Sequence, residues 1–285
     1  MDQDFKVKLL EFVKLALIED VGEGDHTSLS TIGKSKGGEA KLLAKEDGLI
    51  AGVDVALEIF NCIDSSLQLE VFIKDGSRVV YGDIILIVRG NIHSILKAER
   101  LVLNVMQRMS GIATRTATYV DLLKETNAKV LDTRKTTPLL RFLEKQAVKI
   151  GGGENHRFGL YDMILIKDNH VDYAGGISSA INNATIYKKD FGIDIPIEVE
   201  VRNFEELNEV LACEGVDRVM FDNFIPEDVK KAVKLVKGRL VTEASGGITL
   251  DTIKDYALAG VDYISVGALT HSVKSLDLSL KAKLI

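Results

Sequence analysis

The chain lacks the residues and runs that would indicate an exported or membrane-spanning protein. It has 285 residues and only two cysteines, Cys62 and Cys213, which form no CxxC pair. Because disulfides persist mainly in oxidising compartments, two separate cysteines in apolar surroundings predict reduced core thiols and a cytoplasmic protein. Residues 5–22 are amphipathic and contain acids, unlike a signal peptide. No apolar run approaches the roughly 20 residues of a membrane span.

An excess of positive charge is also missing. The formal net charge is −6, which argues against a broad nucleic-acid or membrane surface. Any anion site must therefore be a local cluster of Arg and Lys. The sequence contains neither GxxxxGK[ST] nor GxGxxG, so nucleotide triphosphates and NAD are not supported as cofactors. We expect small-molecule partners, with no nucleic acid and no membrane.

The first part of the chain shows one helical and one extended pattern. Apolar residues recur at helical spacing over residues 6–21. From about 39 to 93, alternating apolar residues broken by glycines predict antiparallel strands, with a hairpin over 71–88 that turns at its DGS sequence. A long helix is predicted to begin at the cap residue Ser94 and to end at Gly111.

The second part contains six short apolar runs, each of which ends in polar residues. Such runs, rich in Val, Ile and Leu at successive positions, are typical of strands buried on both faces of a parallel sheet. Six strands are fewer than the eight of a complete α/β barrel, so the pattern predicts an α/β fold with an incomplete parallel barrel. Barrel chemistry lies at the carboxyl ends of the strands, which makes the polar endings candidate site residues. The runs are VLDTRK (130–135), MILIKDN (163–169), IPIEVEV (195–201), VMFDN (219–223), LVTEASGG (240–247) and YISVGA (263–268).

Basic residues follow the first of these strands. Arg134 and Lys135 precede a helix predicted to begin at Thr137 and the proline after it, so an anion would meet both side-chain charge and a helix N-terminus. Three consecutive glycines then lead to His156 and Arg157. Because the guanidinium fork matches a carboxylate with two hydrogen bonds, these residues favour a carboxylate site. The alternative is a solvated basic loop.

A lysine and several carboxylates end the next strands. Lys167 closes an apolar strand and could contact phosphate or carboxylate, form a Schiff base, or simply extend to solvent at the sheet rim. Glu198 and Glu200 are expected on the same face of one strand, because side chains two residues apart point to the same side, and Asp222 ends the following strand. Such acids suit Mg²⁺ or ribose hydroxyls, unless each pairs with a basic neighbour.

Glycine-rich tips end the last two strands. Ser245, Gly246 and Gly247 are followed by SVGALTHS (265–272). Glycine lets backbone N–H groups approach a phosphate, and barrels commonly place phosphates here, although tight turns also need glycine. Taken together, the strand ends predict a site for a small polycarboxylate, one or two phosphates and Mg²⁺.

In this order the motifs resemble those of quinolinate phosphoribosyltransferases, the carboxylating nicotinate-nucleotide pyrophosphorylases of NAD synthesis. The resemblance covers nearly the whole chain, and its long basic motif is highly specific. It implies transfer of phosphoribosyl from phosphoribosyl pyrophosphate to quinolinate, with release of pyrophosphate and CO₂. It also implies Mg²⁺ and a homodimer with a shared active site. The motifs are GEGDHTS, ERLVLNVMQRMSGIAT, LDTRKTTP, GGGENHRFGLYDMILIKDNH, EVEV, FDN, SGGI and VGALTHS.

The resemblance further implies a two-domain architecture. Residues 1–112 should form an N-terminal open α/β sandwich, which the terminal segment 273–285 rejoins. Residues 113–272 should form an incomplete α/β barrel of six or seven strands.

The resemblance implies roles for the strand-end residues. Arg134, His156 and Arg157 should hold the quinolinate carboxylates, joined by Arg100 from the partner subunit. The residues expected to act in catalysis are Lys135 and Lys167 on the pyrophosphate and substrate acid, and Glu200 and Asp222 on the ribose hydroxyls and, directly or through water, on Mg²⁺. The residues expected to bind the 5-phosphate are Ser245, Gly246, Gly247, Gly267 and His271.

One departure from the family pattern is visible. Leu139 stands where the family usually has glycine, and we expect it to repack on the helix after the proline. Three other functions stay open. They are a paralogous branch associated with molybdate transport, whose IKDNH motif is degraded whereas it is intact here, a Schiff-base aldolase that uses Lys167, and a non-catalytic phosphate-sensing module.

Overall fold

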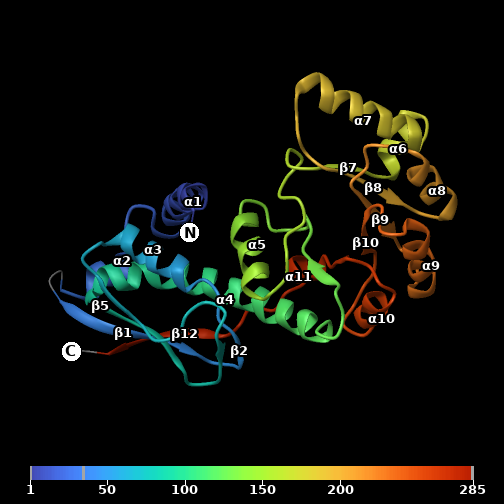
Figure 1. Cartoon of the computed structure of the whole chain (residues 1–285). Helices are drawn as coiled ribbons and strands as arrows, with labels where there is room; N and C mark the ends of the chain where they lie inside the picture. Colours follow the sequence, from blue (N-terminus) through green and yellow to red (C-terminus); the bar gives the residue numbers. More distant parts are fainter. Residues whose placement is uncertain (1, 34–35, 284–285) are drawn as a thin grey trace. The chain divides into compact units, whose positions relative to one another are not determined.

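The computed structural model describes residues 2–33 and 36–283, and its contacts divide the chain into two compact units (Figure 1). The first unit comprises Met1–Ala117, Thr136–Gly152 and Ser272–Ile285, and the second comprises Thr118–Lys135 and Gly153–His271. The predicted boundary at 112 falls inside a helix, and residues 136–152 group with the first unit rather than with the barrel. Residues 1, 34–35 and 284–285 of the predicted domains lie outside the described residues.

The first unit is built on an antiparallel sheet. Its strand order is β12-β1-β5-β3, so the last strand of the chain pairs with the first. Burial along β1 alternates, because successive side chains of a strand point to opposite faces and only one face meets the core. The strands are β1 (Gly37–Ala44), β3 (Gln68–Val71), β5 (Ile84–Asn91) and β12 (Leu278–Lys283), and the helices are α1 (Gln3–Val21), α2 (His26–Thr31), α3 (Val53–Ile63), α4 (Ile92–Leu122) and α5 (Arg141–Ile150).

Helix α4 differs from its prediction at both ends. It begins at Ile92, because Asn91 accepts the backbone N–H groups of His93 and Ser94, and the Ser94 hydroxyl bonds elsewhere. It also continues through Gly111 for another three turns. A side chain at Gly111 would overlap the backbone of Lys274, so this glycine permits close chain packing and does not end the helix.

The predicted 71–88 hairpin is also wrong. Strand β3 pairs with β5, and the chain between them contributes β4 (Arg78–Val79), which pairs with β2 (Gly48–Leu49). The DGS segment serves another element: Asp75 accepts the backbone N–H of Val53 at the N-terminus of α3 at 2.8 Å. A tertiary capping bond therefore organises this segment, and local turn chemistry could not reveal it.

The helix predicted from Thr137 and the following proline begins later than expected. Residues 138–140 form turns, and α5 starts at Arg141. Leu139 lies in the left-handed region with φ 65° and is 83 % exposed, so it does not pack on the apolar face of the helix. Glycine, which the resemblance implies at this position, would adopt this backbone conformation without the cost of about 1–2 kcal/mol that it has for other residues.

The second unit contains the predicted parallel sheet. Its strand order is β6-β11-β10-β9-β8-β7, and the pairings are parallel, as an incomplete α/β barrel requires. An isolated parallel bridge between Leu131 and Glu154 extends the β6 edge. All five residues of β8 are buried, as expected for a strand covered on both faces. The strands are β6 (Lys129–Leu131), β7 (Ile164–Ile166), β8 (Ile197–Val201), β9 (Arg218–Asp222), β10 (Val241–Ser245) and β11 (Tyr263–Ser265).

Helices follow these strands and cover the sheet (Figure 1). Helix α8 packs on β8 and α9 on β10. Local signals set their starts, since Asn203 caps α8 and Pro226 occupies the first turn of α9. The resulting strand–loop–helix order places every strand's carboxyl end in one loop cluster. The helices are α6 (Asp168–Ala174), α7 (Ile177–Phe191), α8 (Phe204–Ala212), α9 (Pro226–Val236), α10 (Ile253–Leu258) and α11 (Ala268–His271).

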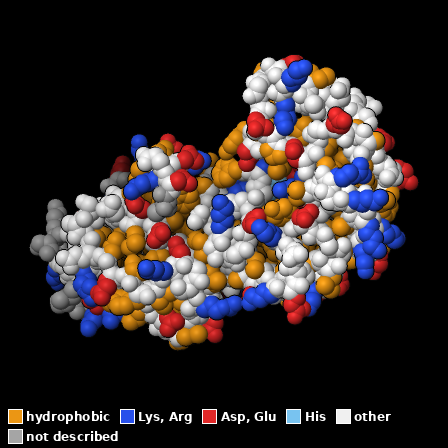
Figure 2. All heavy atoms as spheres, viewed as in Figure 1, with side chains coloured by type: hydrophobic (Ala, Val, Ile, Leu, Met, Phe, Trp, Pro, Cys, Tyr) orange, Lys and Arg blue, Asp and Glu red, His pale blue; other side chains and the backbone are white. Residues whose placement is uncertain are grey.

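The surface carries charged side chains of both signs. Figure 2 shows Lys and Arg interspersed with Asp and Glu on the visible face. Cys62 is exposed and Cys213 is half-buried, so the prediction that both are core thiols is wrong. Among the described residues, no helix combines the length and apolar character needed to cross a bilayer.

Candidate active site

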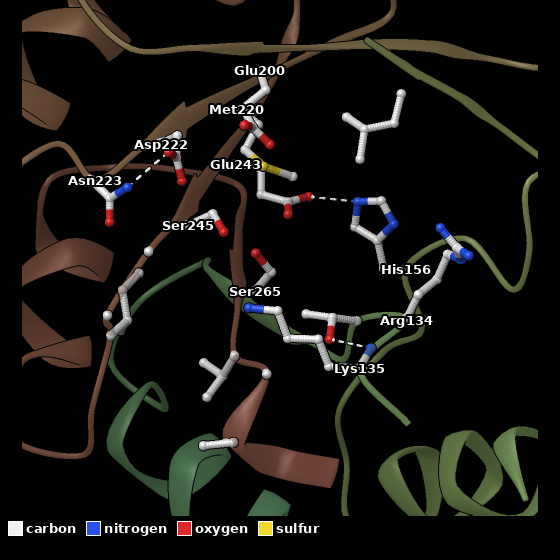
Figure 3. A pocket seen from close by; sticks show the side chains of 18 of the residues that line it. Arg134, Lys135, His156, Glu200, Met220, Asp222, Asn223, Glu243, Ser245 and Ser265 are labelled. Atoms are coloured by element: carbon white, nitrogen blue, oxygen red, sulfur yellow. Dashed lines mark hydrogen bonds and ion pairs between the residues drawn. The ribbon is translucent and has the colours of Figure 1, made fainter. Parts of the chain in front are cut away.

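A cavity of about 800 Å³ lies at the carboxyl ends of the parallel strands (Figure 3). Residues at the ends of all six strands line it, and every lining residue belongs to the second unit. Its size falls within the range of small-molecule sites. The predicted residues that it brings together are Arg134, Lys135, His156, Arg157, Lys167, Glu200, Asp222, Ser245, Gly246, Gly247, Gly267 and His271.

One wall of the cavity is cationic. Arg134 and Lys135 lie in the exposed loop after β6, where the Thr270 hydroxyl donates to the Lys135 carbonyl at 2.8 Å. Arg157 is buried and donates to the Met163 carbonyl at 3.2 Å. Burial lowers the pKa of Arg157, and the neighbouring Arg134 charge adds to this effect. Two such guanidiniums in a concave site favour a ligand that carries more than one carboxylate.

The opposite wall carries acids. The Lys167 ammonium lies 2.6 Å from a carboxylate oxygen of Glu200, which is largely buried. Asp222 accepts a hydrogen bond from the Asn223 side-chain amide at 2.8 Å. These carboxylates end the neighbouring strands β8 and β9, so they face the same part of the cavity. Their oxygens can accept hydrogen bonds from sugar hydroxyls.

The glycine tips form a backbone surface. Gly246 has φ 99° and Gly247 has φ 60°, both outside the usual range of other residues. A Cβ at Gly246 would overlap the Asn223 side chain and lie 2.9 Å from its backbone nitrogen. At Gly267 a Cβ would lie 3.1 Å from the His271 ring and 3.2 Å from the Lys135 side chain. The close approach of neighbouring atoms therefore requires glycine at both tips, and a backbone without side chains is suited to present N–H groups to an anion.

Comparisons with known proteins agree with this geometry. The family model described as "Quinolinate phosphoribosyl transferase, C-terminal domain" matches residues 112–281, and the model of the N-terminal domain matches residues 25–110. The chain belongs to the quinolinate phosphoribosyltransferase family.

Individual relatives of this quinolinate phosphoribosyltransferase chain are similar along its length. "Quinolinate phosphoribosyltransferase [decarboxylating] 2b, mitochondrial" of Nicotiana tabacum is 48 % identical over 96 % of this chain and 82 % of that protein. "Probable nicotinate-nucleotide pyrophosphorylase [carboxylating]" of Bacillus subtilis is 45 % identical over 98 % and 94 %. The crystal structure of NadC from Streptococcus pyogenes superposes with a TM-score of 0.92 at 39 % identity, covering 98 % of this chain and 99 % of the other. These matches do not favour the molybdate-associated branch or an aldolase.

Sequence reasoning named Glu198 but missed Glu243, the second buried acid of this site. Glu243 lines the cavity yet is fully buried, and burial raises its pKa to about 7, with the Glu198 carboxylate adding to the shift. Burial also raises the pKa of Glu198 to about 7. A spacing signal was available, because Glu243 stands two residues before Ser245 just as Glu198 stands two before Glu200. The other lining residues that were not predicted are Thr133, Leu165, Met220, Asn223, Ile248, Thr249, Ser265, Val266 and Ala268.

Of the residues predicted to form the site, Arg100 does not line the cavity. It lies exposed on α4 in the first unit, whereas all residues of the cavity come from the second. Its action on a partner's site stays a prediction.

Glu200 and Asp222 have the donor chemistry that Mg²⁺ requires. They present carboxylate oxygens, and substrate phosphates commonly complete the coordination of Mg²⁺. One oxygen of Glu200 already pairs with Lys167, which leaves Asp222 and the second Glu200 oxygen as donors to the metal or to its water ligands.

Proposed function

We propose that the chain transfers the phosphoribosyl group of phosphoribosyl pyrophosphate to quinolinate with decarboxylation, giving nicotinate mononucleotide, CO₂ and pyrophosphate. The observation that carries the proposal is the gathering of cations, carboxylates and glycine tips in one cavity of a chain that belongs to this family. The reaction would form part of de novo NAD synthesis.

The cationic wall binds quinolinate. Arg134 and Arg157 meet its two carboxylates, and His156 lies beside them. Since the burial of Arg157 weakens competition from water, its charge acts more strongly on a bound carboxylate than it would at the surface. This arrangement orients the ring nitrogen of quinolinate toward the sugar.

The other walls hold phosphoribosyl pyrophosphate. Glu200 and Asp222 accept hydrogen bonds from the ribose hydroxyls, and backbone N–H groups near Gly246 and Gly267 hold the 5-phosphate. Lys135 and Lys167 approach the pyrophosphate. Bound Mg²⁺ supplies further positive charge to the pyrophosphate group.

The chemistry then needs mainly positioning and electrostatics. The ring nitrogen forms a bond to C1 of the sugar while the bond from C1 to pyrophosphate breaks, and the lysines stabilise the charge that leaves. The alkylated ring nitrogen is cationic, so it accepts the electron pair left behind when the adjacent carboxylate departs as CO₂. A proton from solvent replaces that carboxylate. No covalent enzyme intermediate is required.

An aldolase role for Lys167 has less support. A Schiff base needs a neutral amine, which aldolases obtain by desolvating lysine. Here the side chain is 43 % exposed and forms an ion pair with Glu200. Borohydride trapping with phosphorylated sugars provides the test, and an irreversible Lys167 adduct would support the aldolase.

The decisive assay incubates the protein with quinolinate, phosphoribosyl pyrophosphate and Mg²⁺. We expect nicotinate mononucleotide and CO₂ in equal amounts, and a folded protein that forms neither would overturn the proposal. Chelation should abolish turnover and added Mg²⁺ should restore it, whereas full activity in excess chelator would exclude the metal.

We also propose a homodimer whose active site includes the partner's Arg100, in the cytoplasm. The exposure of Arg100 and its place outside the cavity residues of the second unit support this role. Arg100→Ala and Arg157→Ala proteins should each be inactive, and mixing them should restore activity through heterodimers with one intact site. Absence of recovery after verified subunit exchange would contradict a shared site.

A further inference from the structure

The interior of the barrel beneath the cavity contains ionic side chains where apolar layers are the rule. Glu198 on β8 and Glu243 on β10 flank Arg218, the first residue of β9. Both glutamates are fully buried, and His156 lies above them in the cavity wall. We call these four residues the barrel-core column.

Arg218 contacts both glutamates from the amino end of strand β9. Its guanidinium donates to Glu243 at 3.0 Å and lies 4.0 Å from a Glu198 oxygen. It also stacks 4.6 Å from the centre of the Tyr263 ring, which restricts its rotamer. Arg218 lies at the amino end of β9 and Asp222 at the carboxyl end, about 13 Å apart at the usual rise of a strand. Arg218 is therefore remote from the sugar-binding end and is not among the residues that line the cavity.

Both glutamates lie within ion-pair distance of His156. Its ring Nε2 lies 2.9 Å from Glu198 and 3.6 Å from Glu243, as the dashed line to Glu243 in Figure 3 illustrates. Its Nδ1 accepts the backbone N–H of Arg157 at 2.7 Å, so the hydrogen of a neutral ring belongs on Nε2, the nitrogen nearer the carboxylates. Asp132, also buried, accepts the His156 backbone N–H at 2.9 Å. The column thus fixes the ring and, through it, the backbone from which the Arg157 side chain extends.

Stability alone does not explain such a column. Two carboxylates in a barrel core are costly to desolvate, and apolar replacements of buried ion pairs are often equally stable or more so. A metal ion is a second explanation, since the ligand atoms of His156, Glu198 and Glu243 lie within 4.8 Å of one another. However, the Arg218 guanidinium already supplies a cation beside these acids, and a metal ion would add a second.

We propose that Arg218 is a positioning residue for the dicarboxylate substrate, acting through Glu243 and Glu198 on His156 and Arg157. The inference rests on the proposed function, because it assigns the carboxylates of quinolinate to the wall that contains His156. Phosphoribosyl pyrophosphate binds at the other strand ends, so the column should affect one substrate and spare the other.

The test compares Arg218→Met with Arg239→Met, a matched control. Within the described part of the chain, Arg239 donates to backbone carbonyls of helices α8 and α9 in the same unit, and it does not line the cavity. We expect Arg218→Met to raise the KM for quinolinate at least about 10-fold, with the KM for phosphoribosyl pyrophosphate within about twofold, because charge-assisted contacts are stronger than neutral hydrogen bonds. The control should change neither KM.

A rescue separates positioning from general damage. The double variant Arg218→Met/Glu243→Gln removes the carboxylate that Arg218 neutralised, and it should regain part of the quinolinate affinity. If Arg218→Met does not fold, the KM for quinolinate and the KM for phosphoribosyl pyrophosphate are measured instead for Arg218→Lys and for the double variant, and they test the same role of Arg218. Equal increases in both KM values, or no increase in either, would overturn the inference.

Calorimetry with quinolinate distinguishes the two proposals. A wild-type protein that binds quinolinate without forming nicotinate mononucleotide would refute the proposed function, while the affinity of Arg218→Met would still decide the role of the column. Equal quinolinate affinity in wild type and Arg218→Met would refute that role and leave the function intact. Absence of wild-type binding and turnover would reject both.

Discussion

Gly246 offers the sharpest test of the backbone phosphate site. An alanine there must adopt φ 99°, and a left-handed backbone costs a residue with a Cβ about 1–2 kcal/mol. Its Cβ would also lie 2.9 Å from the Asn223 backbone nitrogen, which is held by a 2.9 Å hydrogen bond to the Ser245 carbonyl. Moving Asn223 away breaks that bond, at a further cost of about 1 kcal/mol. The total penalty is therefore about 2–3 kcal/mol.

The penalty can appear in folding or in binding. If the loop keeps its shape, Gly246→Ala lowers the free energy of unfolding by the full amount, which denaturant titration measures. If Asn223 shifts instead, the phosphate cradle opens and the KM for phosphoribosyl pyrophosphate rises by about 30- to 150-fold. The KM for quinolinate should change less than about twofold in either case.

Gly247→Ala provides the matched control. Gly247 also has a left-handed φ of 60°, but a Cβ there would meet no atom within 4 Å. We expect only the conformational cost of about 1 kcal/mol and a smaller change in KM. The reasoning is refuted if Gly246→Ala leaves both unfolding and the KM for phosphoribosyl pyrophosphate unchanged, or if the two variants behave alike.

Three other substitutions test separate features. Leu139→Gly should stabilise the protein by about 0.5–1 kcal/mol by relieving the left-handed backbone, whereas Leu139→Ala should give no gain; equal melting temperatures for all three proteins would contradict this. The raised pKa of Glu243, about 7 against 4.5, predicts stability that is fully present below pH 4.5 and lost as the pH rises through 7, by about 3 kcal/mol. Glu243→Gln should flatten this dependence in denaturant titrations, and an unchanged slope would exclude a proton held there. Lys167→Met should lower kcat/KM about 10- to 100-fold by removing the cation paired with Glu200, and a melting temperature close to that of wild type would show that the loss is functional.

The local sequence pattern was sufficient to predict the parallel sheet. It was insufficient to predict elements that depend on contacts between distant segments. The barrel strands lie in short, largely apolar runs of the sequence and have buried central residues, so these runs located all six. By contrast, the end of α4 depends on the chain that passes Gly111, and residues 71–88 depend on a cap that Asp75 supplies to α3. Helix α5 was predicted to begin too early because leucine has a high helix propensity, whereas the backbone of Leu139 is left-handed and the helix starts at Arg141.

Residue type, spacing and motif order were sufficient to predict the class of fold, the family and the chemical character of the strand ends. Tertiary structure alone decided how those ends combine: Lys167 with Glu200, Gly246 against Asn223, and the buried acids beneath His156. Such pairings arise from strand order and register, which place Glu198, Arg218 and Glu243 on three neighbouring strands. The sequence shows where each charged residue stands but not which charged residue lies beside it in space. Inside a desolvated barrel, that spatial partner largely determines the electrostatic energy of the charge.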